Sequence, residues 1–190
     1  MNESPSINKS FVIMGPSDVT KITRHTTMDK EYWLWLRELV KVSAETFDTL
    51  FFIPDHGVYV DFAMEFLKLK GKDAVIAVMP HGEQWLIQRA HEMGADKIHE
   101  MQAGVGWNYL NTHLVSLAPY ALFLGYSSGS MLELMASKYI RVYENHPTRF
   151  FVDTRVLSVA IPLELVEDIE TITYFSSAAE LKKELKEYVG

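Results

Sequence analysis

The regular exchange of short apolar runs for segments of helical periodicity is the feature that most limits the fold of this chain. Strands are expected at the apolar runs 10–14, 48–54, 73–80, 96–101, 120–125, 149–153, 156–162 and 172–175. Helices are expected between them at 28–47, 56–71, 81–94, 106–119, 129–144 and 177–189. Most of the runs are apolar throughout, as in strands that are covered on both faces. The sequence therefore predicts an α/β, Rossmann-like, doubly wound and mainly parallel sheet with helices on both faces.

Length and composition fit one folded domain. The chain has 190 residues, of which 48% are hydrophobic, enough for a sizeable core. Residues 1–10 are polar and indicate a flexible tail, so a single Rossmann-like domain is expected over 11–190. The chain shows neither a secretory leader pattern nor an apolar stretch of about 20 residues, which favours a soluble, cytoplasmic protein without a membrane partner.

Charge and residue usage narrow the chemistry. The net charge of -7 at pH 7 argues against nucleic acid or an anionic membrane as the main partner. The chain has no cysteine, which excludes disulfides, thiolate catalysis and cysteine-bound metals. Asp55, His56 and His81 follow two expected strands but lack the short ligand spacing of a metal site. Acid–base chemistry and helix capping are the alternatives for these residues, and neither a metal nor a cofactor is predicted.

Small and polar residues cluster where the expected strands end. The segments MGPSDV, IPDHGVYV, MPHGEQW and GYSSGSMLEL each contain glycine and each follow an apolar run. In open parallel sheets, ligands bind outside the carboxyl ends of the strands. We therefore expect these four segments to form a ligand site along one edge of the sheet.

Residues 125–130, GYSSGS, combine glycines with hydroxyl-bearing residues between an expected strand and the helix that follows. One interpretation is a phosphate site, because small residues admit close approach and a helix start offers free N–H groups. The other is a tight turn with Ser130 as the helix N-cap. A nucleophilic Ser127 in the pattern G-x-S-x-G is disfavoured. The only histidine after it, His146, precedes both candidate aspartates, which reverses the order that this class of hydrolase needs.

Gly129, Ser130 and Glu133 match the end of a motif written PGGxGTxxE, and the segment HGVYVDFA matches a second glycine-containing motif. In these motifs and in the order of elements over 10–155, the chain resembles the lysine-decarboxylase-like proteins of the Lonely Guy type. These proteins are cytokinin-activating phosphoribohydrolases within a broader Rossmannoid nucleotide-binding group. The resemblance implies a nucleotide or another phosphorylated small molecule as the ligand and Glu133 as the catalytic residue.

The resemblance and the strand ends together nominate ligand-binding residues. These are Gly15, Ser17, Asp55, His56, Gly57, Asn111, Ser127, Ser128, Gly129 and Ser130. Leu110 stands where the family has an arginine, and a leucine cannot stabilise charge on a phosphate or on a departing base. The chain is therefore expected to be either a divergent N-glycosidic-bond hydrolase of nucleoside monophosphates or a nucleotide sensor without catalysis. For Glu133, a first-turn acid that complements the helix dipole is the structural alternative.

Aromatic residues predict self-association. The chain has 4 Trp, 9 Tyr and 10 Phe, several of them on expected helices with more than one apolar face. A helix that is apolar on two sides needs two partners. A homodimer or a higher even oligomer is therefore expected.

Overall fold

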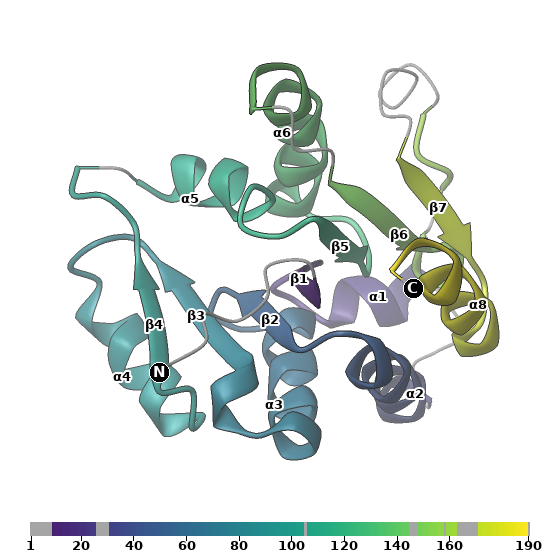
Figure 1. The fold of residues 1–190 in the computed structure, drawn as a ribbon, viewed down its shortest axis with the longest axis horizontal. Helices are drawn as coiled ribbons and strands as arrows, with labels where there is room; N and C mark the ends of the chain where they lie inside the picture. The colour runs from purple at the N-terminus through teal and green to yellow at the C-terminus, as the bar shows by residue number, and fades with distance from the viewer. Residues whose placement is uncertain are drawn as a thin grey trace.

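A sheet of seven parallel strands forms the centre of the molecule, in a computed structural model that describes residues 9–25, 31–104, 106–144, 148–157, 159–162 and 171–189 (Figure 1). The strands are β1 Ser10–Met14, β2 Thr49–Phe52, β3 Val75–Met79, β4 Lys97–Glu100, β5 Tyr120–Phe123, β6 Arg149–Asp153 and β7 Ile172–Phe175. Their order across the sheet is β4-β3-β2-β1-β5-β6-β7, and every neighbouring pair is parallel. This arrangement confirms the predicted Rossmann-like α/β fold.

The strand order reverses its direction at β1. From β1 the chain adds β2, β3 and β4 on one side, and it then returns to add β5, β6 and β7 on the other. Crevices form at such a switch point, outside the carboxyl ends of the two central strands. Here those ends are Met14 of β1 and Phe123 of β5, which are paired in the sheet.

Helices cover both faces of the sheet. The described α-helices are α1 Thr20–His25, α2 Tyr32–Thr46, α3 Val58–Lys70, α4 Gln84–Glu92, α5 Trp107–Leu114, α6 Ser128–Glu144 and α8 Ala178–Tyr188. In Figure 1, α2, α3 and α4 lie below the sheet, and α5 and α6 lie above it, which agrees with the two apolar clusters that these helices share with the strands. α8 packs against α2 on the lower face.

Strand residues alternate between these two apolar cores. Phe11 and Ile13 of β1 belong to the core between the sheet and α2 and α3. Val12 and Met14 belong to the core between the sheet and α5 and α6. All four residues are at most 1% exposed. Two covered faces are the reason why the strands appear in the sequence as unbroken apolar runs.

The apolar run 156–162 differs from its prediction. It was expected to be a strand, and its described residues, 156–157 and 159–162, form none. The Asp153 side chain accepts a hydrogen bond from the backbone N–H of Arg155 at 3.0 Å, and the 3-10 helix η4, Thr154–Val156, begins there. This local hydrogen bond turns the chain away at the end of β6, which the apolar pattern alone does not reveal.

The segment between β1 and α2 contains a helix that the sequence did not predict. In front of α1, the Asp18 carboxylate accepts hydrogen bonds from the backbone N–H and the hydroxyl of Thr20 at 3.0 and 2.6 Å. Such a bond to the N–H two residues on is a local signal for a helix start. α2 begins at Tyr32, and Asp29, the N-cap expected for it, lies outside the described residues.

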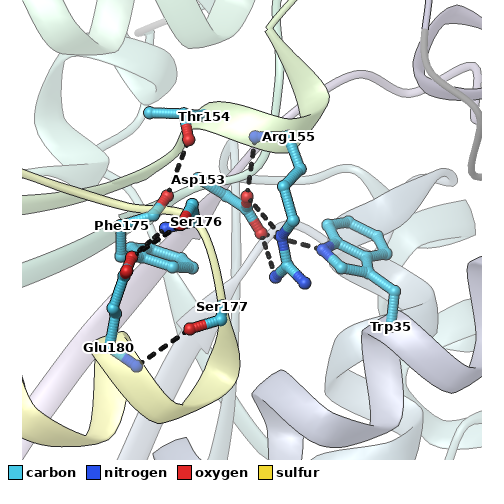
Figure 2. Close-up of polar contacts among 8 residues, drawn as sticks. All are labelled: Trp35, Asp153, Thr154, Arg155, Phe175, Ser176, Ser177 and Glu180. Carbon is cyan, nitrogen blue, oxygen red and sulfur yellow. Dashed lines mark hydrogen bonds and ion pairs between the residues drawn. The ribbon is translucent and has the colours of Figure 1, made fainter.

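A buried cluster around Asp153 ties the end of β6 to α2 (Figure 2). The Asp153 carboxylate accepts a 2.8 Å hydrogen bond from the Trp35 indole N–H. It also accepts two bonds from the Arg155 guanidinium, at 3.0 Å from Nε and 2.7 Å from Nη2. Next to this cluster, the Glu180 carboxylate of α8 accepts hydrogen bonds from the backbone N–H and the hydroxyl of Ser176. Together these contacts hold α2 and the start of α8 at the carboxyl ends of β6 and β7.

The predicted N-terminal tail, 1–10, lies mostly outside the described residues, and Ser10 is already the first residue of β1. No helix in the described ranges combines the length and the apolarity that a membrane crossing needs. The domain bounds, the cytoplasmic location and the oligomer remain predictions.

Candidate ligand-binding site

A cavity of about 260 Å³ lies at the switch point of the sheet. It is bounded by the loops after β1 and β2, by α1, α3 and α5, and by the start of α6. The lining residues are Ile13, Gly15, Ser17, Lys21, Ile53, Asp55, Tyr59, Trp107, Asn111, Leu114, Ser127, Ser128, Gly129, Ser130 and Glu133. Three of the four strand exits predicted to gather here therefore do so, whereas the exit of β3 does not line the cavity.

The start of α6 is capped by two serines that bond to each other. The Ser127 N–H donates to the Ser130 hydroxyl at 2.8 Å, and the Ser130 N–H donates to the Ser127 hydroxyl at 3.0 Å. This reciprocal pair is a capping box built from serines. The Ser130 hydroxyl also lies 3.0 Å from the Gly125 carbonyl, to which it can donate. Ser127 is therefore the N-cap, in place of the predicted Ser130, and both hydroxyls have partners within the protein.

The two residues after the N-cap, Ser128 and Gly129, present their N–H groups at the start of α6. The Met131 N–H donates to the Ser127 carbonyl at 3.0 Å and so closes the first turn of the helix. Within the described ranges, the N–H groups of Ser128 and Gly129 donate to no protein acceptor. Free N–H groups at a helix start, together with the helix dipole, attract anions. Both interpretations of the serine stretch thus apply, to different atoms: the hydroxyls of Ser127 and Ser130 form the turn, and the next N–H groups are available to a ligand.

Glu133 is the buried carboxyl group of the cavity. It is 5% exposed and lines the cavity, and no hydrogen bond or ion pair from a described residue reaches its carboxyl. Burial raises the pKa of Glu133 to about 8, so the carboxyl is mostly protonated at pH 7. A protonated carboxyl both donates and accepts hydrogen bonds. The alternative of a first-turn acid is wrong, because the first turn of α6 contains no acid.

Asp55 and Tyr59 form the wall of the cavity on the side of β2 and α3. Burial raises the pKa of Tyr59, and the nearby carboxyls of Asp55 and Glu133 raise it further. The Tyr59 hydroxyl therefore stays protonated and can donate a hydrogen bond. These three side chains give the cavity a set of groups suited to hydroxyl-bearing ligands.

Asp55, His56 and His81 do not form a common metal set. The His56 ring pairs with the Asp55 carboxylate, and its side chain is 60% exposed. His81 pairs instead with Glu100, at 3.1 Å. Across the described ranges, no three His, Asp or Glu side chains are grouped so that they could hold a metal ion. Each of the two histidines therefore pairs with its own neighbouring acid, and the two do not meet at a common metal site.

Two glycines let the loops after β1 and β2 approach each other. Gly57 has a φ of 100°, and a Cβ there would overlap the backbone around Ser17. A Cβ on Gly15 would overlap the Val58 side chain. Gly57 therefore acts one step away from the cavity: its lack of a side chain allows Ser17 to reach the cavity wall.

Lys21 is a lining residue that the sequence did not predict. It is exposed on α1, which follows β1 at the switch point. Leu110, which the sequence resemblance set at the position of an arginine, is 0% exposed and belongs to the core between the sheet and α5. The cavity thus has a cation from a different element. One sequence signal could have found Lys21. Asp18 and Thr20 follow the end of β1, and the hydrogen bond from the Thr20 N–H to the Asp18 carboxylate marks the start of a helix just before Lys21.

Most of the nominated residues meet at this cavity. Those that line it are Gly15, Ser17, Asp55, Asn111, Ser127, Ser128, Gly129, Ser130 and Glu133. His56 and Gly57 do not line it, the first because its ring points to solvent beside Asp55 and the second because it packs against the loop after β1. The roles of the lining residues in binding or catalysis remain predictions.

Fold and cavity together define a Rossmann-like α/β protein with an open crevice at its switch point. No family model and no curated protein matches the chain. Among solved structures, the molybdenum cofactor binding protein from Rippkaea orientalis is similar with a TM-score of 0.61 at 16% identity, with 100% of each chain covered. The molybdenum cofactor carrier protein from Chlamydomonas reinhardtii has a TM-score of 0.60 at 12% identity, over 95% of this chain and 97% of that one.

A third similar structure is DNA processing protein A from Helicobacter pylori, which binds single-stranded DNA. Its TM-score is 0.55 at 11% identity, over 99% of this chain and 91% of that one. At these identities the likeness supports the Rossmann-like fold, and it does not confirm the Lonely Guy type. It also corrects one expectation: the exclusion of nucleic acid is wrong, because a protein of this fold binds it. Net charge averages over a whole surface, whereas a phosphate responds to local groups.

Proposed function

We propose that this protein binds a nucleotide or a similar phosphorylated small molecule at the switch point of its sheet. One observation carries the proposal. The N–H groups of Ser128 and Gly129 and the buried carboxyl of Glu133, none of which has a partner among the described residues, belong to the same cavity. The first pair suits a phosphate and the second group suits a sugar hydroxyl, and a phosphorylated sugar contains both.

The phosphate end of the ligand is assigned to the start of α6. Two N–H groups there have no acceptor in the described part of the chain, and Ser128 is exposed at the same position. Lys21 adds a cation to the lining. Hydrogen bonds in which one partner is ionised are about twice as strong as neutral ones. This combination holds a phosphate without the arginine that Leu110 replaces.

The sugar end of the ligand is assigned to the carboxyl and amide groups of the cavity. Glu133, Asp55 and Asn111 bring one protonated carboxyl, one carboxylate and one amide to it. Because Glu133 is mostly neutral at pH 7, it does not repel a phosphate bound nearby. A charged glutamate at the same place would oppose the anion that the helix start attracts.

Binding without hydrolysis is the form of this function that the site favours. N-glycosidic cleavage develops positive charge on the sugar, which an ionised carboxylate stabilises, whereas a protonated carboxyl can act only as an acid toward the leaving base. Burial keeps Glu133 mostly protonated, and Leu110 is enclosed in the core. The non-catalytic sensor is therefore preferred over the divergent hydrolase.

Gly129→Val is expected to weaken the binding of AMP at least about tenfold. A Cβ at Gly129 would lie 3.7 Å from side-chain atoms of Asn111 and Ser127, so the helix accepts it. The branched Cγ atoms of valine extend further, into the space beside the free N–H groups, where they exclude a phosphate. Calorimetric titration with AMP measures the loss.

The matched control for this substitution is Ala179→Val. Ala179 holds the same position in α8, two residues after the N-cap Ser177, and it lies away from the cavity. The control should bind AMP as the wild type does. If Gly129→Val is folded and binds AMP with unchanged affinity, the serine stretch is only a turn and the phosphate site lies elsewhere.

AMP is expected to remain intact during prolonged incubation with the protein at pH 7. The physical reason is the protonated Glu133 together with the apolar Leu110. Chromatographic measurement of free adenine tests this expectation. Rapid release of adenine that Glu133→Gln abolishes would contradict the loss of catalysis, while it would support Glu133 as part of the site.

A further inference from the structure

One exposed tryptophan lines the cavity, and a second exposed tryptophan contacts it. Trp107, the first residue of α5, lines the cavity and is 38% exposed. Trp85 of α4 is 48% exposed, and its ring centroid lies 6.4 Å from that of Trp107, with 34° between the ring planes. The Trp85 indole N–H donates to the Glu83 carboxylate at 2.8 Å. Large aromatic side chains that stay exposed next to a cavity mark a contact surface.

The spacing of the two rings determines where a ligand can lie. A ring placed between them would need about 3.5 Å on each side, and parallel planes. Centroids 6.4 Å apart with a 34° tilt leave no such space. The two indoles therefore contact each other, and Trp107 offers only the part of its surface that belongs to the cavity.

The size of the cavity indicates that part of the ligand extends to this rim. Pockets for drug-sized ligands have volumes of about 300–1,000 Å³. A cavity of about 260 Å³ takes a phosphate and a sugar, and a further ring then reaches the mouth, where Trp107 lies.

We propose that Trp107 stacks on a planar heteroaromatic ring of the ligand, so that the ligand is a mononucleotide with its base rather than a sugar phosphate. This inference rests on the proposed function and specifies its ligand class. The cavity presents three kinds of group: N–H donors with Lys21, carboxyl and amide groups, and an exposed indole. They correspond to the phosphate, the sugar and the base of one nucleotide.

A single-stranded nucleic acid is the less favoured occupant. Proteins that bind single strands use several stacking rings and a cationic groove that follows the backbone. Among the described residues that line the cavity, Lys21 is the one cation and Trp107 the one exposed aromatic residue, because Tyr59 is half-buried. Trp85 is in contact with Trp107 and so does not provide a second, separate platform.

The test is calorimetric titration of the full chain with AMP, ribose 5-phosphate and inorganic phosphate. The wild type is expected to bind AMP about tenfold more tightly than ribose 5-phosphate, as base stacking on an aromatic ring provides. Trp107→Ala should bring the two affinities close together while the affinity for ribose 5-phosphate stays unchanged. Trp107→Phe should keep most of the preference for AMP.

Tyr109→Ala is the matched control, because Tyr109 is an exposed aromatic residue of the same helix that does not line the cavity. It should bind AMP as the wild type does. An AMP affinity that Trp107→Ala leaves unchanged overturns the inference and leaves the proposed function intact. If the wild type binds neither AMP nor ribose 5-phosphate, both the inference and the proposed function are overturned. A five-residue oligothymidylate that binds about a hundredfold more tightly than dTMP, through Trp107, overturns the inference in favour of single-stranded nucleic acid.

Discussion

Replacing Glu133 with glutamine is expected to stabilise the protein at pH 8.5 and to change its stability little at pH 5. Burial raises the pKa of Glu133 from 4.5 to about 8 on folding. Between these values the unfolded chain has released a proton that the folded protein still holds, so the stability of the wild type falls as the pH rises. Each pKa unit between the folded and the unfolded state corresponds to about 1.4 kcal/mol of the free energy of unfolding. The cost accumulated by pH 8 is therefore on the order of 5 kcal/mol, and glutamine, which does not ionise, avoids it.

Thermal unfolding at pH 5, 7 and 8.5 measures this effect. In a chain of this size, 1 kcal/mol shifts the melting temperature by about 2–4 °C, so Glu133→Gln should melt at least about 10 °C above the wild type at pH 8.5. The control Glu187→Gln changes an exposed glutamate of α8 and should show no such pH-dependent difference. A difference between Glu133→Gln and wild type that is the same at all three pH values would contradict the raised pKa.

Asp153→Ala is expected to lower the free energy of unfolding by about 3–5 kcal/mol. The carboxylate is 0% exposed and accepts hydrogen bonds from Trp35 and from two nitrogen atoms of the Arg155 side chain (Figure 2). Its removal leaves the buried indole N–H without an acceptor and the half-buried guanidinium without its counter-charge. Loss of one member of a buried ion pair is among the most destabilising single changes.

Chemical denaturation measures the free energy of unfolding of Asp153→Ala and of a surface variant. The comparison shows whether the loss of stability comes from a buried ion pair or from the loss of any ion pair. Glu45→Ala removes the exposed pair between Glu45 of α2 and Lys182 of α8, whose atoms lie 2.6 Å apart. Exposed pairs contribute little, so this control should lose much less stability than Asp153→Ala. Asp153→Asn keeps an acceptor for the Trp35 indole and should fall between the wild type and Asp153→Ala. Equal losses in Asp153→Ala and Glu45→Ala would show that the cluster does not support the fold.

The fold was predictable because strands covered on both faces leave a clear pattern of apolar residues in the sequence. Residues such as Phe11 and Val12 face opposite cores, so a strand that is covered twice must be apolar throughout. The run 156–162 has the same apolar appearance, yet a single hydrogen bond to Asp153 redirects the chain there. Apolar pattern therefore predicts where a strand is possible, and local polar contacts decide whether it forms.

The edge that carries the candidate site was predictable for a topological reason: parallel strands end together. The details were not, because they depend on distances between segments. A helix of six residues such as α1 shows too little periodicity to be found, so Lys21 escaped notice. Either Ser127 or Ser130 could be the N-cap by residue type. The reciprocal hydrogen bonds between them, which the sequence does not show, make Ser127 the N-cap. The neutrality of Glu133 follows from burial by neighbouring elements, which a motif does not record.

β1 joins the two halves of the sheet through five residues, Ser10–Met14, paired to β2 on one side and to β5 on the other. The edge strands β4 and β7 can open locally, whereas the amide protons of β1 are released to solvent only when the halves separate. Their hydrogen exchange should therefore report global unfolding. Gly15, Ser17 and Lys21 follow β1 directly, so the same event dismantles the cavity. A ligand held there would slow exchange most strongly in the central strand, although only the carboxyl end of that strand reaches the cavity.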